Sequence, residues 1–213
     1  MSRAWLPRRI PEAVLLSLMA AALCAGAAFA QDPSDVPRAV QVIGSDPHAR
    51  RCVNGIMAGD TSEPIMAACD RALRYPRLSR EAELQIRLNR GVAHLRRREN
   101  DLALADFDAV IGLEPRQAEA HVNRGAVLVQ MGQPGPAVAA LTEALSLGVQ
   151  EPHKAYFNRG AAREALGDLR GAFEDYNTAL EIQPDWGPAN AELARFARGR
   201  RAHLANILGE PTP

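Results

Sequence analysis

Apolar residues recur at intervals of three and four along much of the chain, which is the spacing of an amphipathic helix. Between residues 63 and 73, one helical face carries Ile65, Ala68, Cys69, Ala72 and Leu73. A preceding helix is expected to start at Pro47, because Asp46 can serve as its N-cap. A turn at Gly59–Ser62 then separates the two helices, and Ser62 can cap the second. Residues 46–83 are therefore predicted to form a helical pair.

A second apolar stripe lies near the C-terminus. Its members are Leu193, Phe196, Ala197, Leu204, Ile207 and Leu208. The arginines of this segment lie mostly off the stripe, where they could contact anionic lipid or a partner. We favour the simpler interpretation that they form the solvated face of a terminal helix. Residues 187–213 are predicted to be a C-terminal capping helix and a tail.

The tripeptide Asn-Arg-Gly occurs three times, at residues 89–91, 123–125 and 158–160, with spacings of 34 and 35 residues. Other positions recur in register with the three glycines. Twelve residues after each glycine comes an alanine, sixteen residues after it an aromatic residue or leucine, and nineteen residues after it a valine or alanine. In that order these positions are Ala103, Ala137, Ala172; Phe107, Leu141, Tyr176; and Val110, Ala144, Ala179. Such a period is typical of stacked helical units.

The pattern resembles the tetratricopeptide repeat, a helix–turn–helix unit of about 34 residues. The resemblance implies an all-α fold, a short α-solenoid of antiparallel helix pairs. It predicts about three units, at residues 84–117, 118–152 and 153–186, between a degenerate N-terminal helical pair and the capping helix. The arrangement is also similar to small exported tetratricopeptide proteins of Gram-negative bacteria, in which a two-cysteine helical pair precedes Asn-Arg-Gly repeats.

The small residues of each unit have a physical interpretation. The glycine of each tripeptide is expected to let the two helices of a unit approach closely. The large residue sixteen positions later is expected to fill the space between neighbouring units. Gly132 and Gly167 are predicted to end the first helices in the left-handed conformation. The first unit has no glycine in its turn, so Asn100 is expected to take that role.

Two carboxylates recur as well. Asp106 and Asp175 occupy the same position of the second helix, directly before the large residue. Arg90 and Arg159 of the tripeptides are predicted to pair with them, within or between units. As solvent-exposed pairs they would contribute about 0–1 kcal/mol each. The second unit has an alanine at this position, so Arg124 needs another partner.

The N-terminus has the layout of a targeting segment. Three arginines precede an uncharged apolar run, and Ala28-Phe29-Ala30 supplies the small residues of a cleavage site. We predict a secretory signal peptide over residues 1–30, a flexible leader over 31–45 and a periplasmic location. An uncleaved signal that anchors the protein to the inner membrane is the alternative.

Composition limits the function classes. The 213-residue chain has 25 basic and 25 acidic side chains, and it is not expected to bind nucleic acid. Residues 1–30 carry three arginines and one glutamate, so the remaining 183 residues have a charge of −2. They also retain two of the three cysteines, Cys52 and Cys69. In an exported protein such a pair predicts a disulfide, which would stabilise a terminal unit by about 3 kcal/mol. Two buried free thiols are the alternative.

No motif for catalysis, metal binding or a cofactor is present. The five histidines are scattered, and those within the repeats occupy different positions of the unit. We therefore predict a protein that is not an enzyme and has no cofactor or metal site. A catalytic function would require His94, His121 and Glu119 to converge in space.

The tetratricopeptide resemblance implies a protein-binding groove lined by the first helix of each unit. The positions carried over are Leu88, Asn89, Val92 and Leu95; Glu119, Val122, Asn123, Ala126 and Val129; and Lys154, Phe157, Asn158 and Ala161. The three asparagines could pair with the backbone of an extended peptide or could bond only within the fold. Lys154 is the only cation in this set, which disfavours a carboxylate-binding groove.

These features predict an exported, non-catalytic scaffold that binds a protein or peptide segment. An alternative is an accessory docking subunit for a cell-envelope enzyme, such as a peptidoglycan hydrolase. Self-association through an end of the repeat array is a further alternative. Stable membrane insertion is not expected once the signal is cleaved.

Overall fold

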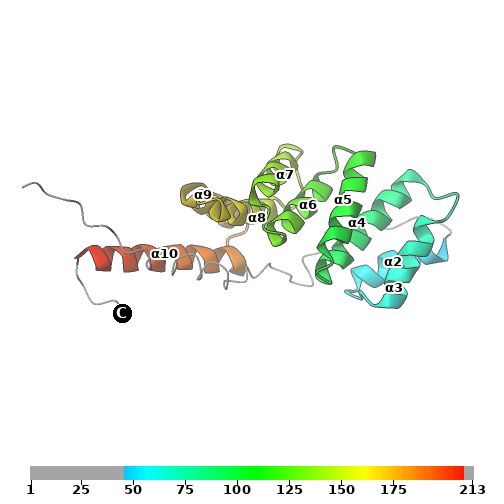
Figure 1. Cartoon of the computed structure of the whole chain (residues 1–213), viewed down its shortest axis with the longest axis horizontal. Coiled ribbons are helices and arrows are strands. Elements are labelled where there is room, and N and C mark those ends of the chain that lie inside the picture. Colours follow the sequence, from blue (N-terminus) through cyan, green and yellow to red (C-terminus); the bar gives the residue numbers. More distant parts are fainter. Residues whose placement is uncertain (1–45, 209–213) are drawn as a thin grey trace, which may run out of the picture. The chain divides into compact units, whose positions relative to one another are not determined.

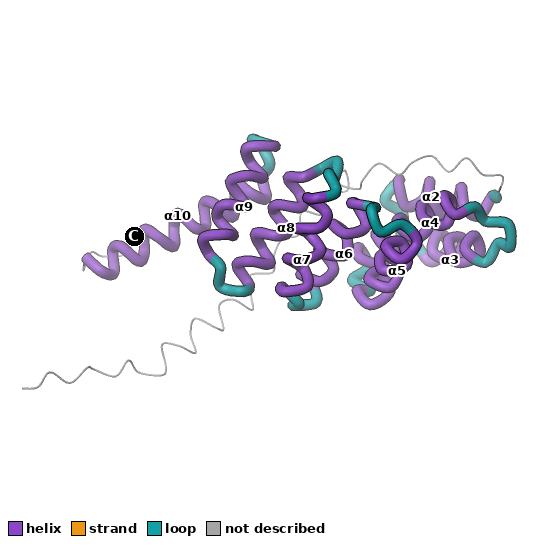
Figure 2. Tube along the Cα trace, turned by 90° about the horizontal axis from the view of Figure 1, so that it is seen from above, coloured by secondary structure: helices purple, strands orange, loops and turns teal. Residues whose placement is uncertain are grey.

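The computed structural model describes residues 46–208, and the side chains of residues 46–199. These residues form helices joined by turns and contain no strand (Figure 1, Figure 2). The prediction of an all-α fold is therefore confirmed. The predicted signal peptide, the leader and the last five residues lie outside the described part. Within that part, no helix is sufficiently long and apolar to span a membrane.

The helices follow one another as antiparallel pairs. An N-terminal pair, α2 (Pro47–Met57) and α3 (Glu63–Leu73), precedes three units. The units are α4 (Arg80–Arg96) with α5 (Asn100–Leu113), α6 (Ala118–Gln130) with α7 (Pro134–Ser146), and α8 (Pro152–Ala165) with α9 (Leu169–Ile182). We call α4, α6 and α8 the A helices and α5, α7 and α9 the B helices. The last helix is α10 (Gly187–Leu208), which packs against α9.

Neighbouring A helices contact one another, α4 with α6 and α6 with α8, and α2 contacts α4 in the same way. Each B helix of the first two units also contacts the A helix that follows it. Helix α4 begins at Arg80, four residues before the predicted start of the first unit. Ser79 accounts for this earlier start, because its hydroxyl accepts a hydrogen bond from the backbone N–H of Ala82 (3.2 Å). The neighbouring contacts place the A helices in one layer.

The turn within the first unit differs from the prediction. The left-handed residue is Arg98, with φ of 61°, and Asn100 is instead the first residue of α5. Arg98 follows the end of its A helix by two residues, as Gly132 (φ 68°) and Gly167 (φ 82°) follow theirs. The helix-ending geometry thus fixes which position is left-handed, and the residue present there must adopt it.

The glycine of each tripeptide lies against the large side chain of its own unit. A Cβ atom on Gly91 would lie 2.7 Å from Cε1 of Phe107, and one on Gly160 would lie 2.8 Å from Cε1 of Tyr176. Gly125 meets Leu141 in the same way. The predicted close approach of the paired helices is present. The large residue, however, packs between the two helices of one unit, where it is fully buried, rather than only between units.

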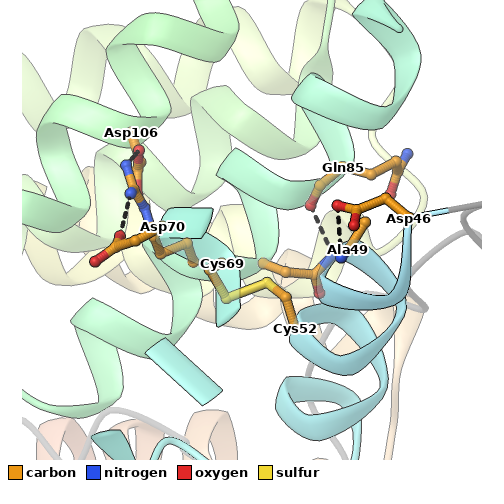
Figure 3. The surroundings of a disulfide bond; sticks show 9 residues. Asp46, Ala49, Cys52, Cys69, Asp70, Gln85 and Asp106 are labelled. Carbon is orange, nitrogen blue, oxygen red and sulfur yellow. Dashed lines mark hydrogen bonds and ion pairs between the residues drawn. A yellow bond between two sulfur atoms is a disulfide. The ribbon is translucent and has the colours of Figure 1, made fainter. Parts of the chain in front are cut away.

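The N-terminal pair is closed by a disulfide. Cys52 of α2 and Cys69 of α3 are fully buried and bonded to each other, with their Cα atoms 4.9 Å apart (Figure 3). This is the pairing that the sequence favours. The same core includes Ile56 and Ile65, and Ile86 from α4 completes it. The disulfide thus lies in the apolar core that joins the N-terminal pair to the first unit.

Replacing Gly160 by alanine is expected to destabilise the protein by about 1–3 kcal/mol, because the methyl group would overlap the Tyr176 ring and approach the Ala172 carbonyl oxygen. Chemical denaturation would measure the change. Gly112→Ala is the control, since a Cβ at that helical position meets no atom within 4 Å and should be neutral or slightly stabilising. Equal effects of the two substitutions would contradict the close-approach interpretation.

Candidate functional site

The predicted groove positions lie on adjacent A helices and are mostly half-buried. On α4, Leu88, Val92 and Leu95 pack against a buried cluster at the junction of α4, α5 and α6. On α6, Val122 and Val129 pack in the same way against the cluster shared by α6, α7 and α8. Each of these side chains keeps part of its surface accessible. The A helices therefore have accessible apolar surface whose side chains are fixed by packing on the buried clusters.

The three tripeptide asparagines differ in their surroundings. Asn89 is buried, and its side-chain N–H donates to the Gln85 carbonyl oxygen at 2.7 Å. Asn123 and Asn158 are half-buried, and within the described residues neither side-chain amide makes a hydrogen bond. Asn89 thus stabilises its own helix. Asn123 and Asn158, on the neighbouring helices α6 and α8, have amides that remain available to a ligand.

Two further groove positions are covered by the protein itself. Phe157 is only 6% exposed, because the ring of Trp186 lies 5.0 Å and the ring of Tyr176 5.4 Å from its own (centroid distances). Ala126 is also buried, whereas Ala161 is half-buried. The expectation that Phe157 lines an open surface is therefore corrected: it belongs to the core of the third unit. Trp186 lies outside the repeated pattern, so the repeat alone could not reveal this cover.

Most charged side chains of this face form hydrogen bonds or ion pairs within the protein. Lys154 donates to a carboxylate oxygen of Glu151 at 3.0 Å. On α8, Glu164 accepts hydrogen bonds from Arg195 of α10 at 2.6 and 2.5 Å, and from the Tyr176 hydroxyl at 3.2 Å. Burial, and then the charge of Glu164, raises the pKa of Tyr176, so its hydroxyl remains a donor. This network fastens α10 to the third unit.

Arg90 joins three helices. Its guanidinium donates two hydrogen bonds to Asp106 of α5, at 2.8 and 2.6 Å. Its remaining terminal nitrogen donates to Asp70 of α3 at 2.7 Å, next to the disulfide; Asp70 and Asp106 are both labelled in Figure 3. One side chain therefore connects the N-terminal pair to both helices of the first unit.

The other tripeptide arginines repeat this arrangement in part. Arg159 donates two hydrogen bonds to Asp175 of its own unit (2.9 and 2.7 Å) and one to Thr142 of the preceding B helix (3.3 Å). The bond to Asp175 is the main cause that raises the pKa of Arg159. In the second unit, Arg124 donates a hydrogen bond to Asp108 of the preceding B helix at 2.6 Å. Each arginine thus contacts the B helix before it.

The predicted pairings are present, but their burial differs from the prediction. The side chains of Asp106 and Asp175 are only 3% and 4% exposed, whereas Asp108 is 49% exposed. A second arginine, Arg163, also reaches Asp175, at 2.9 Å. The pairs of the first and third units are therefore buried, and removal of one partner leaves an uncompensated charge.

The histidines considered for catalysis have separate partners. His94 hydrogen-bonds Glu99 at 2.6 Å through its Nδ1, and His121 hydrogen-bonds the Pro115 carbonyl oxygen at 2.9 Å through its Nε2. The structure does not link either ring to Glu119. The arrangement that a catalytic function would require is therefore not formed by these groups.

One surface feature escaped the sequence-based prediction. A hollow of about 520 Å³ lies at the turn of the first unit, beside the end of α6. Its lining residues are Arg98, Glu99, Asn100, Asp101, Leu102 and Met131. The signal in the sequence was the missing glycine of this turn, which places an arginine at the left-handed position.

Residues 153–185, the third unit, match the family model of the tetratricopeptide repeat. The third unit is a tetratricopeptide repeat. The matched segment contains α8 and α9, the helices that carry Asn158, Arg159 and Gly160. The predicted resemblance to this family is confirmed.

The repeats also resemble those of curated and solved proteins. Over 107 residues, half of this chain, they are 29% identical to RNA polymerase II-associated protein 3 of Xenopus tropicalis, and the match spans 16% of that protein. The fold is similar to that of MamA from Desulfovibrio magneticus RS-1, with a TM-score of 0.61, 21% identity and coverage of 75% of this chain and 88% of that one.

A second solved structure contains a ligand. It is the first tetratricopeptide domain of Spaghetti (RPAP3) bound to the HSP90 peptide SRMEEVD. Its TM-score is 0.52, its identity is 24%, and the similarity covers 56% of this chain and 94% of that one.

Asp175→Ala is expected to destabilise the protein by about 3 kcal/mol, because Arg159 and Arg163 would lose their shared buried carboxylate. The exposed pair of the second unit supplies the control, since Asp108→Ala should change stability by about 0–1 kcal/mol. Thermal and denaturant unfolding of both variants would measure the difference. A loss for Asp175→Ala no larger than that for Asp108→Ala would mean that burial adds nothing to this pair.

Proposed function

We propose that this protein is an exported, non-catalytic adaptor that binds an extended protein segment across its A helices. The observation that carries this proposal is the pair of side-chain amides on α6 and α8. Asn123 and Asn158 occupy the same position of successive units, are half-buried and have no hydrogen-bond partner for their side-chain amides among the described residues. An amide offers one acceptor and two donors, which match the backbone groups of an extended peptide.

The surroundings of the two amides suit such a ligand. Val122 and Val129 on α6 and Ala161 on α8 keep apolar surface accessible beside them. These side chains pack on buried clusters, so the surface is ordered before a ligand arrives, which reduces the entropy lost on binding. The peptide complex of the RPAP3 domain supports the use of this fold for peptide binding.

The expected ligand differs from that peptide in charge. SRMEEVD ends in acidic residues, whereas the A-helix positions of this chain contain one lysine, which donates to Glu151. Glu119 adds a negative charge to the same set of positions. We therefore expect the A helices to select an uncharged, apolar segment rather than an acidic tail.

Export is part of this proposal. It is supported by the signal-like residues 1–30 and by the buried Cys52–Cys69 disulfide, since disulfides persist in oxidising compartments such as the periplasm. The periplasmic partner would then be a secreted or envelope protein.

A photo-reactive amino acid at position 123 is expected to cross-link a partner in cells. The same amino acid at position 139 is the control, because Ala139 is exposed on a B helix away from the amides. Gel mobility and mass spectrometry would identify the products, and thermal unfolding would confirm that both variants fold. Equal yields from the two positions, or no product from position 123, would argue against binding across the A helices.

The protein isolated from cells is expected to begin at Gln31, since the signal would be removed after Ala30. N-terminal sequencing of the protein from the periplasmic fraction would test this. An intact Met1 on membrane-associated protein would instead support the anchored alternative.

A further inference from the structure

The N-terminal pair carries a set of arginines without partners. Most arginines in the described part of the repeats bind a carboxylate or a carbonyl oxygen. Four exposed arginines of this pair make no hydrogen bond or ion pair through their side chains. They are Arg50 on α2, Arg71 in the last turn of α3, and Arg74 and Arg77 just after α3. Unpaired guanidinium groups present five donors each to solvent and remain available to an anionic ligand.

The disulfide places these arginines at the same end of the pair. Helices α2 and α3 are antiparallel, and Cys52 and Cys69 bring their backbones within 4.9 Å. Arg50 precedes Cys52 by two residues and Arg71 follows Cys69 by two, so both lie about 3 Å along the axis in the same direction. Arg74 is the C-cap of α3, and Arg77 follows in the turn after it. We call Arg50, Arg71, Arg74 and Arg77 the arginine end.

The carboxylates of this pair do not neutralise the arginine end. Asp60 and Glu63 lie at the opposite end, at the turn between α2 and α3. Asp70 is bonded to Arg90. Asp46 lies at the same end, but its carboxylate accepts hydrogen bonds from the backbone of the first turn of α2. Positive charge therefore remains in excess there.

An aromatic side chain accompanies the charges. Tyr75 lies between Arg74 and Arg77 and is 45% exposed. The backbone N–H of Leu78 donates to the Tyr75 carbonyl oxygen at 3.1 Å, so the turn that carries these residues is ordered. Exposed tyrosine and arginine side chains are typical of the centre of protein interfaces.

The distribution of charge over the chain limits the size of the partner. Residues 99–151 contain eight acidic and two basic side chains, and the whole chain has no net charge. A partner with a large, uniformly negative surface would gain little from the rest of the chain. A short acidic segment would contact the arginines alone.

We propose that the arginine end is a second docking surface, which binds a short acidic segment of a protein partner. Arginine forks match carboxylates in a bidentate geometry, and Tyr75 supplies apolar contact beside them. The surface is separate from the A-helix amides and does not depend on their function. A partner could use both surfaces, with an apolar stretch on the A helices and an acidic stretch at the N-terminal pair.

Fluorescence anisotropy with two labelled peptides, (Glu-Gly)5 and (Gln-Gly)5, tests this proposal on the purified protein. We expect the acidic peptide to bind and the neutral one not to bind. In the variant R71E/R74E/R77E the affinity for the acidic peptide should fall by about tenfold or more, because three attractions become repulsions. The loss should shrink as salt is raised.

The control variant is R98E/R116E/R198E, which changes the net charge equally at three other exposed arginines whose side chains have no partner among the described residues. It should retain the affinity of the wild type within about twofold. Circular dichroism would show that both variants are folded. An equal loss in the two variants, or no binding of (Glu-Gly)5, would overturn the proposal. Tighter binding of phosphatidylglycerol vesicles or single-stranded DNA than of the peptide, lost in R71E/R74E/R77E, would assign the surface to another class of partner and also overturn it.

Discussion

The close approach of two helices at a glycine is the constraint on which the rest of each unit depends. Because Gly91, Gly125 and Gly160 have no side chain, the ring or isobutyl group of the B helix lies directly on the A-helix backbone. This contact sets the distance between the helices of a unit. It therefore also determines which groups the side chains of the other two tripeptide residues can contact.

The contacts of the arginine before the glycine depend on this distance between the helices. With the helices close together, the guanidinium of Arg90 or Arg159 meets an aspartate that directly precedes the large B-helix residue, and the carboxylate is shielded from water. The same side chain extends to the second helix of the preceding pair, α3 for Arg90 and α7 for Arg159, so packing within a unit and stacking between units are coupled. The asparagine before it lies on the A-helix face. Three consecutive residues thus serve the core, the stacking contact and the candidate binding surface.

The sequence alone predicted those parts of the structure that are local or periodic. The 34-residue spacing predicted the helical pairs, and the charge pattern predicted the partners of Arg90 and Arg159. Burial of Asp106 could not be predicted, because it depends on how closely two helices and the preceding pair assemble. Arg98 was missed because an arginine has no intrinsic preference for the left-handed region. Counting seven residues from each tripeptide glycine would have found it, since Gly132 and Gly167 occur at that distance.

The candidate site was less predictable than the fold for a related reason. Its positions were inferred from the repeat pattern. Equivalent positions of two units have the same surroundings only if the neighbouring units are also alike. Phe157 occupies a groove position, but the third unit ends at Trp186 and is followed by α10 instead of another unit, and the Trp186 ring covers Phe157. The second unit differs again, because Ala140 replaces the buried aspartate and Arg124 is held only by an exposed pair. Its helices are joined mainly by the apolar contact of Gly125 with Leu141. The amides of Asn123 and Asn158 lie on the neighbouring helices α6 and α8, so a bound segment would connect the second unit to the third.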